Sequence, residues 1–204
     1  MLNPQKNLEI FKFFVKNLFL VENLRKITKV LPVLKIQLHH NDTCVVIKKK
    51  ELKSVLLFFK NHIKYQFKVL TCISGIDYPS HKYRFKVIYE LLSVRFNSRL
   101  RIKIFTHELM PVESVGSLFS AASWYECEIW DMFGIFFSNH VNLVRLLTDY
   151  GFEGYPLRKD FPLSGFVESS YDYTRKRVSS ERVELSQEYR SFNTTSPWET
   201  LNLQ

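Results

Sequence analysis

The chain has 204 residues, of which 46% are hydrophobic and 24% are charged, and its formal net charge is +9. These fractions are ordinary for a folded protein, so they exclude a wholly disordered chain. The length suits one domain with room for a tail. No stretch approaches the ~18 consecutive apolar residues that a membrane span requires, so we expect a soluble or peripheral protein.

The positive charge is concentrated in one part of the chain. Residues 1–70 hold 14 Lys and Arg against 4 Asp and Glu, whereas residues 71–157 hold 8 against 9 and residues 158–204 hold 7 against 7. A nucleic-acid site would combine Arg with exposed aromatic side chains, but the Phe residues of the basic region fall at core-like positions. We therefore interpret the lysines as a solvated face and rank nucleic-acid binding as a minor alternative.

The cysteines and the first residues narrow the cellular context. Cys44, Cys72 and Cys127 are far apart and follow no CxxC spacing, so we expect neither a zinc or iron–sulfur site within the chain nor a disulfide framework. That favours a reducing compartment. Lys12 and Lys16 interrupt the opening apolar stretch, which we interpret as an amphipathic helix rather than a secretory signal. Frequent Phe and Lys with few Gly suggest an A/T-rich genome, as in many organelles.

The first half of the chain alternates between helical and strand patterns. Apolar residues at three- and four-residue spacing over 8–27 predict a helix that ends before Pro32. Alternation over 34–39, the turn residues Asn41-Asp42 and a second run over 43–47 predict a hairpin. Residues 50–63 return to helical spacing.

The second half predicts a sheet followed by helices. Runs over 67–77, 85–91 and 100–104 predict a meander of three antiparallel strands. Ser114 is placed to cap a helix over 115–132 that ends at Gly134, and a short helix is predicted over 143–147. This order predicts an α+β fold with a mainly antiparallel sheet, packed helices and an extended C-terminal tail.

The domain boundary is predicted near Pro162. Residues 1–161, including the N-terminal helix, form the α+β domain, and residues 162–204 form the tail. The tail lacks periodicity but holds frequent aromatic residues, among them Tyr171 and Trp198. This pattern favours a segment that docks on partner subunits; a frayed end with chance aromatics is the alternative.

The densest polar cluster is residues 124–131 (WYECEIWD). On a helix, Glu128 and Asp131 share a face while Glu126 points elsewhere. Acid–base or metal chemistry would need further ligands, and no recognised motif supplies them. We therefore expect Glu128 and Asp131 to form ion pairs at a packed contact within the chain or with another subunit. The basic residues available are Arg145, Arg158 and Lys159.

Other catalytic arrangements have weaker support. Cys127 with His140 or His107 would form a thiolate–imidazole pair, but neither histidine has a recognisable nucleophile context, and free Cys is usually a small core residue. The glycines follow no nucleotide-binding spacing. Residues 154–162 (GYPLRKDFP) form a stiff charged loop that suits docking better than catalysis. The residues alone therefore predict an interaction protein without visible catalytic apparatus.

The same segments carry a family resemblance. Residues 124–134 (WYECEIWDMFG) resemble the signature W-x-E-R-E-x-x-D-M-F-G, residues 139–147 resemble its continuation N-H-P-x-L-x-R-x-L, and residues 148–160 (TDYGFEGYPLRKD) match almost throughout. Residues 75–79, 84–93 and 196–199 extend the match. The chain resembles the peripheral-arm subunit of NADH:ubiquinone oxidoreductase (respiratory complex I) that is called NADH dehydrogenase subunit 9 in mitochondria and has a counterpart in bacteria. The motif residues assigned to interfaces are Glu126, Glu128, Asp131, Arg145, Gly154, Pro156, Arg158, Lys159 and Asp160.

The resemblance implies a non-catalytic structural subunit of the hydrophilic arm. Such a subunit scaffolds the subunits that surround the quinone site. It thereby supports electron transfer from NADH to ubiquinone. The chain would bind no metal or cofactor; FMN, iron–sulfur clusters, NADH and ubiquinone belong to the complex. The implied partners are peripheral-arm subunits, chiefly the quinone-cavity subunit and its cluster-bearing neighbour, with no nucleic acid. The implied location is the matrix side of the mitochondrial inner membrane, reached only through the complex, with an organelle-encoded gene.

Two positions depart from the family pattern. Cys127 stands where the family has Arg, which removes a cation between Glu126 and Glu128, so another cation compensates or the encoded sequence differs for another reason. Val141 replaces the usual Pro, which loosens that turn.

A scaffold of a membrane-bound hydrogenase-type complex is the alternative function, and a basic nucleic-acid-binding module ranks third.

Overall fold

A computed structural model of the protein describes residues 30–39, 42–190 and 192. The helix predicted over 8–27 lies outside these residues, as do the turn residue Asn41 and Trp198. The chain divides into two compact units, residues 1–161 and residues 162–204.

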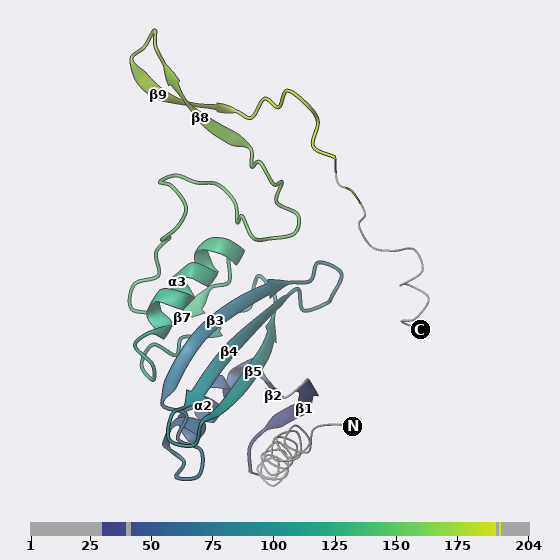
Figure 1. The fold of residues 1–204 in the computed structure, drawn as a ribbon, viewed down its shortest axis with the longest axis vertical. Coiled ribbons are helices and arrows are strands. Elements are labelled where there is room, and N and C mark those ends of the chain that lie inside the picture. The colour runs from purple at the N-terminus through teal and green to yellow at the C-terminus, as the bar shows by residue number, and fades with distance from the viewer. Residues whose placement is uncertain (1–29, 40–41, 191, 193–204) are drawn as a thin grey trace, which may run out of the picture. The chain divides into compact units, whose positions relative to one another are not determined.

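The first unit is built on a five-stranded sheet in the order β1-β2-β5-β4-β3 (Figure 1). The β2–β5 pair is parallel, and the other neighbouring pairs of this sheet are antiparallel. The predicted β1–β2 pairing and the predicted β3-β4-β5 meander are therefore confirmed. The strands are β1 (Val33–His39), β2 (Asp42–Ile47), β3 (Val69–Asp77), β4 (Phe85–Ser93) and β5 (Ser98–Thr106).

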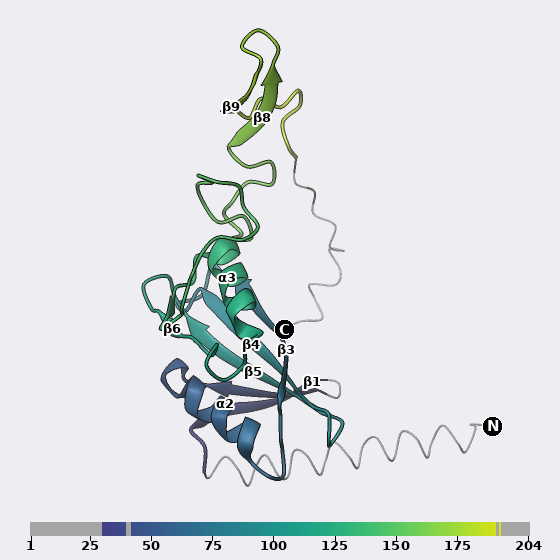
Figure 2. The same cartoon turned by 90° about the vertical axis from the view of Figure 1, so that its left-hand side faces the viewer.

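Two helices cover one face of this sheet (Figure 2). α2 (Leu52–Asn61), preceded by the 3-10 turn η1 (Lys49–Glu51), buries four apolar side chains, and α3 (Ala122–Phe133) packs against β3. Gly75 permits this contact, because a Cβ atom there would lie 2.7 Å from the ring of Phe133. Residues of β4 alternate between buried and half-buried, as the sequence pattern predicted. The α+β prediction is confirmed.

The predicted helix over 115–132 is wrong at its start. Residues 115–121 form turns, and α3 begins at Ala122. The Ser114 hydroxyl does not cap the helix, because it donates to Glu126 Oε2 at 2.6 Å and accepts the Gly116 N–H at 3.2 Å. The predicted end is confirmed, since Gly134 has a φ of 75° and its N–H donates to the Trp130 carbonyl.

The predicted short helix over 143–147 is also wrong. The described backbone there is irregular, because the N–H groups of residues 146–148 donate to the Asp131 carboxylate rather than to carbonyls one turn earlier. Upstream, β6 (Val112–Glu113) pairs in parallel with β7 (Phe137–Ser138), which holds the turns before α3 beside the segment after it.

The second unit contains a two-stranded antiparallel hairpin of β8 (Val167–Asp172) and β9 (Arg177–Arg182). Asp172 Oδ1 accepts the N–H groups of Thr174 and Arg175 at 2.8 and 3.2 Å, which shapes the turn. The sequence did not indicate this hairpin, because nearly all of its side chains are exposed and no buried–exposed alternation marks its strands.

Candidate functional site

Asp131 ties the loop after α3 to the helix. Its side chain is fully buried, and Oδ2 accepts the N–H groups of Leu146, Leu147 and Thr148 at 3.2, 2.7 and 2.9 Å. Oδ1 accepts the Thr148 hydroxyl at 2.6 Å and lies 3.6 Å from Arg145 Nη1. Burial acts to raise the pKa of Asp131, but the hydrogen bonds together outweigh it and hold the pKa below its usual value. The expected pairing of Asp131 with a basic residue is thus found, with backbone donors in addition.

A second buried carboxylate, Asp77, anchors the GYPLRKD loop to the end of β3. Arg84 donates from Nε to Oδ1 at 2.7 Å and from Nη2 to Oδ2 at 2.9 Å, and the Lys159 N–H reaches Oδ2 at 2.9 Å. The same Arg84 Nη2 lies 2.9 Å from Asp160 Oδ1. The hydrogen bond from Arg84 lowers the pKa of Asp77 and also that of Asp160. One arginine therefore joins the sheet to the loop.

Arg158 closes the same contact from the other side. Its Nε donates to the Phe133 carbonyl at 2.7 Å, its Nη1 lies 2.9 Å from Glu108 Oε1, and its guanidinium lies 4.4 Å from the Tyr155 ring centroid. The close approach needs Gly134, since a Cβ atom there would lie 2.6–2.7 Å from Tyr155 and Arg158.

The remaining predicted loop residues have structural positions. Gly154 has a φ of 101°, and a Cβ atom there would lie 2.8 Å from the Phe161 ring. The Gly154 carbonyl accepts Arg145 Nη1 at 3.1 Å. Pro156 is half-buried, whereas the Lys159 side chain is exposed and only its backbone N–H takes part in the contact described above.

Glu126, predicted to lie on a different face of the helix from Glu128 and Asp131, is fully buried. Its carboxylate accepts the Ser114 hydroxyl at 2.6 Å and the Val115 N–H at 2.8 Å, and burial raises its pKa. Glu128 is exposed, and the expected ion pair of Glu128 is not found among the described residues. Its pairing with another subunit stays a prediction.

The cysteine–histidine pair, which had weak support in the sequence, is brought together. Cys127 Sγ lies 3.9 Å from His140 Nε2. His140 Nδ1 accepts the Asn142 N–H at 3.1 Å, so in the neutral ring the proton is on Nε2. A protonated Nε2 cannot accept the thiol proton, and the thiol instead donates to the Asn142 carbonyl at 3.5 Å. The arrangement favours a packed, neutral thiol over a nucleophile.

His140 lies where it can supply positive charge near Glu126, in place of the Arg that the family pattern has at position 127. Its Nε2 lies 3.8 Å from Glu126 Oε2 and within 3.2 Å of the Ser123 hydroxyl and carbonyl oxygens. When protonated, this imidazole is the cation nearest to Glu126 among the described contacts. The charge lowers the pKa of Glu126, but less than burial raises it.

Asp77 and Arg84 are not among the interface residues predicted from the motifs, although they hold one of the two anchor points. A signal was present in the pattern. Asp77 lies at the end of one strand and pairs in register with Phe85 at the start of the next, so Arg84 is placed beside it. An acid and an arginine that flank a predicted strand turn are candidates for such a pair.

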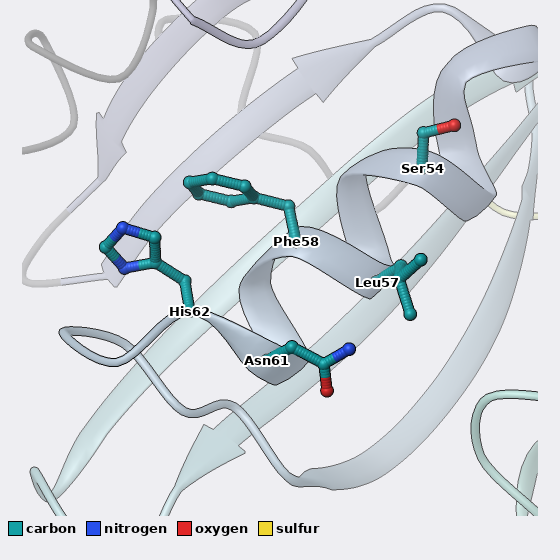
Figure 3. Close-up of a pocket in the computed structure, with 5 residues that line it drawn as sticks. All are labelled: Ser54, Leu57, Phe58, Asn61 and His62. Carbon is teal, nitrogen blue, oxygen red and sulfur yellow. The ribbon is translucent and has the colours of Figure 1, made fainter.

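Two grooves on the described surface lie away from these anchors. One of about 430 Å³ is lined by the outward residues of α2 (Figure 3), and one of about 270 Å³ lies beside η1 and β6. Neither is lined by a predicted site residue. The first groove is lined by Ser54, Leu57, Phe58, Asn61 and His62, and the second by Lys49, Lys50, Pro111, Glu113, Ser138 and Asn139.

The part of the chain that the structure describes contains neither a helix suited to span a membrane nor a group of side chains suited to ligate a metal ion. None of its described helices has the length and hydropathy to cross a membrane. Within the same residues, no three or more His, Cys, Asp or Glu side chains are grouped so that they could hold a metal ion.

Comparison with known proteins identifies the family to which the chain belongs. A model of the family described as "Respiratory-chain NADH dehydrogenase, 30 Kd subunit" matches residues 45–167, which begin within β2 and contain α2, β3 to β5, α3 and the loop at 154–160. The chain belongs to this family. The resemblance stated from the motifs is therefore confirmed, and the chain is a subunit of respiratory complex I, NADH:ubiquinone oxidoreductase.

Individual family members match over most of their length. The "NADH-ubiquinone oxidoreductase subunit 9" of Reclinomonas americana is 54% identical over 157 residues, 77% of each chain. The protein of the same name from Prototheca wickerhamii is 52% identical over 164 residues, 80% of this chain and 85% of its own. The "NADH dehydrogenase [ubiquinone] iron-sulfur protein 3" of Beta trigyna is 56% identical over 151 residues, 74% of this chain and 79% of its own.

Proposed function

We propose that this subunit is a scaffold of the peripheral arm of complex I and holds the subunits that surround the quinone site. In this proposal it has no catalytic residue and binds no cofactor, while the FMN, iron–sulfur clusters, NADH and ubiquinone are bound elsewhere in the complex. Its partners are peripheral-arm subunits, chiefly the one that forms the quinone cavity and its cluster-bearing neighbour. It lies on the matrix side of the mitochondrial inner membrane and reaches the membrane only through the complex.

One observation carries this proposal: the charged motif residues serve the chain's own architecture, and the segments they fix present apolar side chains to solvent. Asp131 and Asp77 are engaged by backbone N–H groups and arginines, as described above. The loops that they hold expose Val141 and Tyr150 completely and Leu147 to 64%. Rigidly held, exposed apolar side chains are typical of a protein interface.

The second unit supports the same proposal. An isolated two-stranded hairpin is only marginally stable in water, and β8–β9 presents Tyr171, Tyr173 and Val178 with more than half of each side chain exposed. A partner surface that buries these side chains would supply the apolar contact that the hairpin lacks. The proposed docking of residues 162–204 on neighbouring subunits follows from this.

The test is assembly of the complex with variants of the exposed loop. Val141→Asp and Tyr150→Asp place a charge on fully exposed side chains, so we expect the thermal unfolding of the purified chain to be unchanged. We expect the amount of intact complex in native gels, and its NADH:ubiquinone activity, to fall at least tenfold. Ile63→Asp, at a position that is 79% exposed outside the anchored loops, is the matched control. Normal assembly with Asp at 141 and 150 would contradict the scaffold role of this loop.

The absence of a cofactor is tested separately. The purified full-length chain is expected to show no flavin or iron–sulfur absorbance and no bound iron. A stoichiometric flavin or cluster that remains after gel filtration would overturn that part of the proposal while leaving membership of the complex intact.

A further inference from the structure

The face of the sheet opposite α2 and α3 is a second surface that the anchored loops do not use. Register places Lys86, Ile88, Glu90 and Leu92 of β4 on this face, paired with Phe105, Lys103, Arg101 and Arg99 of β5. Neighbouring strands extend the same rows through Lys35 and Ile76, with the buried Val46 between the rows of β1 and β5. Both helices pack on the other face (Figure 2).

This open sheet face has a strong charge asymmetry. Among its strand residues with described side chains, Glu90 is the one carboxylate, and it pairs with Arg101 across the β4–β5 ladder. The basic side chains on the same face are Lys35, Lys86, Arg99, Arg101 and Lys103.

Lys86 and Lys103, at the centre of this face, contact uncharged groups that do not neutralise their positive charge. Lys86 Nζ lies 4.5 Å from the Tyr78 ring centroid and 5.3 Å from that of Phe105, and Lys103 Nζ lies 3.5 Å from Gln37 Oε1. Neither lysine has a carboxylate partner among the described residues. Uncharged neighbours orient an ammonium group but do not neutralise it, so the positive potential remains at the surface.

Apolar side chains lie between these charges. Phe105 and Val69 are each 40% exposed, and Ile76, Ile88 and Leu92 are half-buried. A face that interleaves apolar contact area with one sign of charge is complementary to an amphipathic surface of the opposite charge. We propose that the open sheet face docks an acidic amphipathic surface of a neighbouring complex I subunit.

Charge complementarity selects another subunit over the chain's own segments. Residues 1–29 carry six Lys and Arg against two Glu, so they would add positive charge to a face that is already basic. Residues 162–204 carry five Lys and Arg against six Asp and Glu, so their net charge of −1 offers little attraction. The inference rests on the proposed function, because it requires the chain to be surrounded by other subunits.

The first test uses the intact complex and a carbodiimide, which couples an amine directly to a carboxylate in contact with it. Mass spectrometry is expected to find Lys86 and Lys103 joined to Asp or Glu of another subunit. Lys64 and Lys68, exposed before β3 and outside this face, are the internal control and are expected to be coupled at least tenfold less. Coupling of Lys86 and Lys103 only to residues 1–29 or 162–204 of the same chain would overturn the proposal.

The second test reverses the charge. We expect Lys86→Glu with Lys103→Glu to lower incorporation into the complex at least tenfold, Lys86→Gln with Lys103→Gln to lower it less, and Lys64→Glu with Lys68→Glu to leave it unchanged. Thermal unfolding of each purified chain checks that the variants fold. Wild-type incorporation of the folded Lys86→Glu/Lys103→Glu chain would refute docking at this face. A wild-type chain that does not co-purify with the complex would instead refute the proposed function.

Discussion

Helix α3 has one buried carboxylate toward each end, and the surrounding residues shift the pKa values of these two carboxylates in opposite directions. Glu126 and Asp131 both have fully buried side chains. The pKa of Asp131 is held below its usual value, whereas burial raises the pKa of Glu126. The helix is the same, so the difference comes from the segments that each carboxylate meets.

The number of hydrogen-bond donors separates the two ends. Asp131 accepts three backbone N–H groups and a hydroxyl from the loop after the helix. Glu126 accepts one hydroxyl and one backbone N–H from the turns before the helix. Burial penalises both ionised forms, but only the larger set of donors outweighs the penalty. The Asp131 end therefore fastens a loop through a stable anion, and the Glu126 end holds a carboxyl group that resists ionisation.

The largest loss of folding stability is expected from a substitution of Asp131. Asp131→Ala removes the shared acceptor of three backbone N–H groups, and each buried donor left without a partner costs about 1–3 kcal/mol. We expect the free energy of unfolding of the full-length chain to fall by at least about 3 kcal/mol in urea titrations. Proteolysis is expected to begin in residues 141–157, because these lose their attachment.

Glu128→Ala is the matched control on the same helix. Its side chain is exposed and unpaired among the described residues, so we expect a change within about 0.5 kcal/mol. Equal losses for the two variants would mean that helix propensity, not the buried acceptor, explains the Asp131 effect.

The sheet could be predicted from the sequence because its strands alternate between core and surface. In β4, buried Phe85, Val87 and Tyr89 are separated by half-buried residues, and this period of two is visible without a structure. The loop after α3 could not be predicted in the same way. Its backbone donors bind the side chain of Asp131, a long-range partner that local spacing does not reveal, so apolar spacing over 143–147 suggested a helix instead.

The candidate site shows the same division. The motifs identified Asp131, Arg145 and Arg158 as paired residues, but helical spacing placed Glu128, rather than Glu126, with Asp131 at the expected packed contact. Which face of α3 is buried depends on where the turns at 114–121 lie, and these were expected to be helical. The error in the start of the helix and the error in the buried carboxylate thus have one cause.

A third buried carboxylate, Asp77, resembles Asp131, because its pKa is also held below the usual value. Hydrogen bonds to charged groups contribute about 1.5–3 kcal/mol, so Arg84→Gln is expected to cost about 2–3 kcal/mol at pH 7. Arg84 lowers the pKa of Asp77. The stability that Asp77 supplies is thus present above the unfolded-state pKa of about 3.9 and is lost as the pH falls through the lower folded-state pKa.

The difference between wild type and Arg84→Gln should accordingly shrink between pH 7 and pH 2–3, as measured by urea unfolding. Lys53→Gln, which removes the partly exposed ion pair with Glu113, is the control and is expected to cost less than about 1 kcal/mol. A loss at Arg84 that stays constant over this pH range would show that packing, rather than the pairing with Asp77, supplies the stability.

The Glu126 end predicts the opposite pH dependence. Because burial raises the pKa of Glu126, its contribution is fully present below the unfolded-state pKa of about 4.3 and is lost as the pH rises through the folded-state value. Glu126→Gln cannot ionise, and it keeps one acceptor oxygen for the Val115 N–H while its NH2 group faces the Ser114 oxygen. We expect the variant to lie within about 1 kcal/mol of wild type at pH 4 and to gain on it as the pH rises to 8.

His140 is the neighbour that complicates this measurement, since its imidazole lies 3.8 Å from Glu126 Oε2. Repeating the pH series in a His140→Gln background removes the imidazole that lowers the pKa of Glu126, so the gain of the Glu126→Gln variant should become larger. A wild-type chain that gains on Glu126→Gln as the pH rises would mean that Glu126 is an anchored anion like Asp131, and the contrast between the two ends would fail.

The smallest effect is expected at Tyr89, which faces the Glu126 end from β4. Its hydroxyl is buried and has no hydrogen-bond partner among the described residues, and burial, with the negative charge of Glu126, raises its pKa well above the usual value. Tyr89→Phe removes an unpaired polar group at the cost of a small void, so unfolding free energies should differ by less than about 1 kcal/mol. Because the hydroxyl remains protonated at every pH where the fold is stable, the change should be the same at pH 5 and pH 8. A loss above about 1 kcal/mol that disappears in a Glu126→Leu background, which has no side-chain acceptor, would instead show that the hydroxyl donates to the Glu126 carboxylate, which would give that end a third donor and narrow its difference from Asp131.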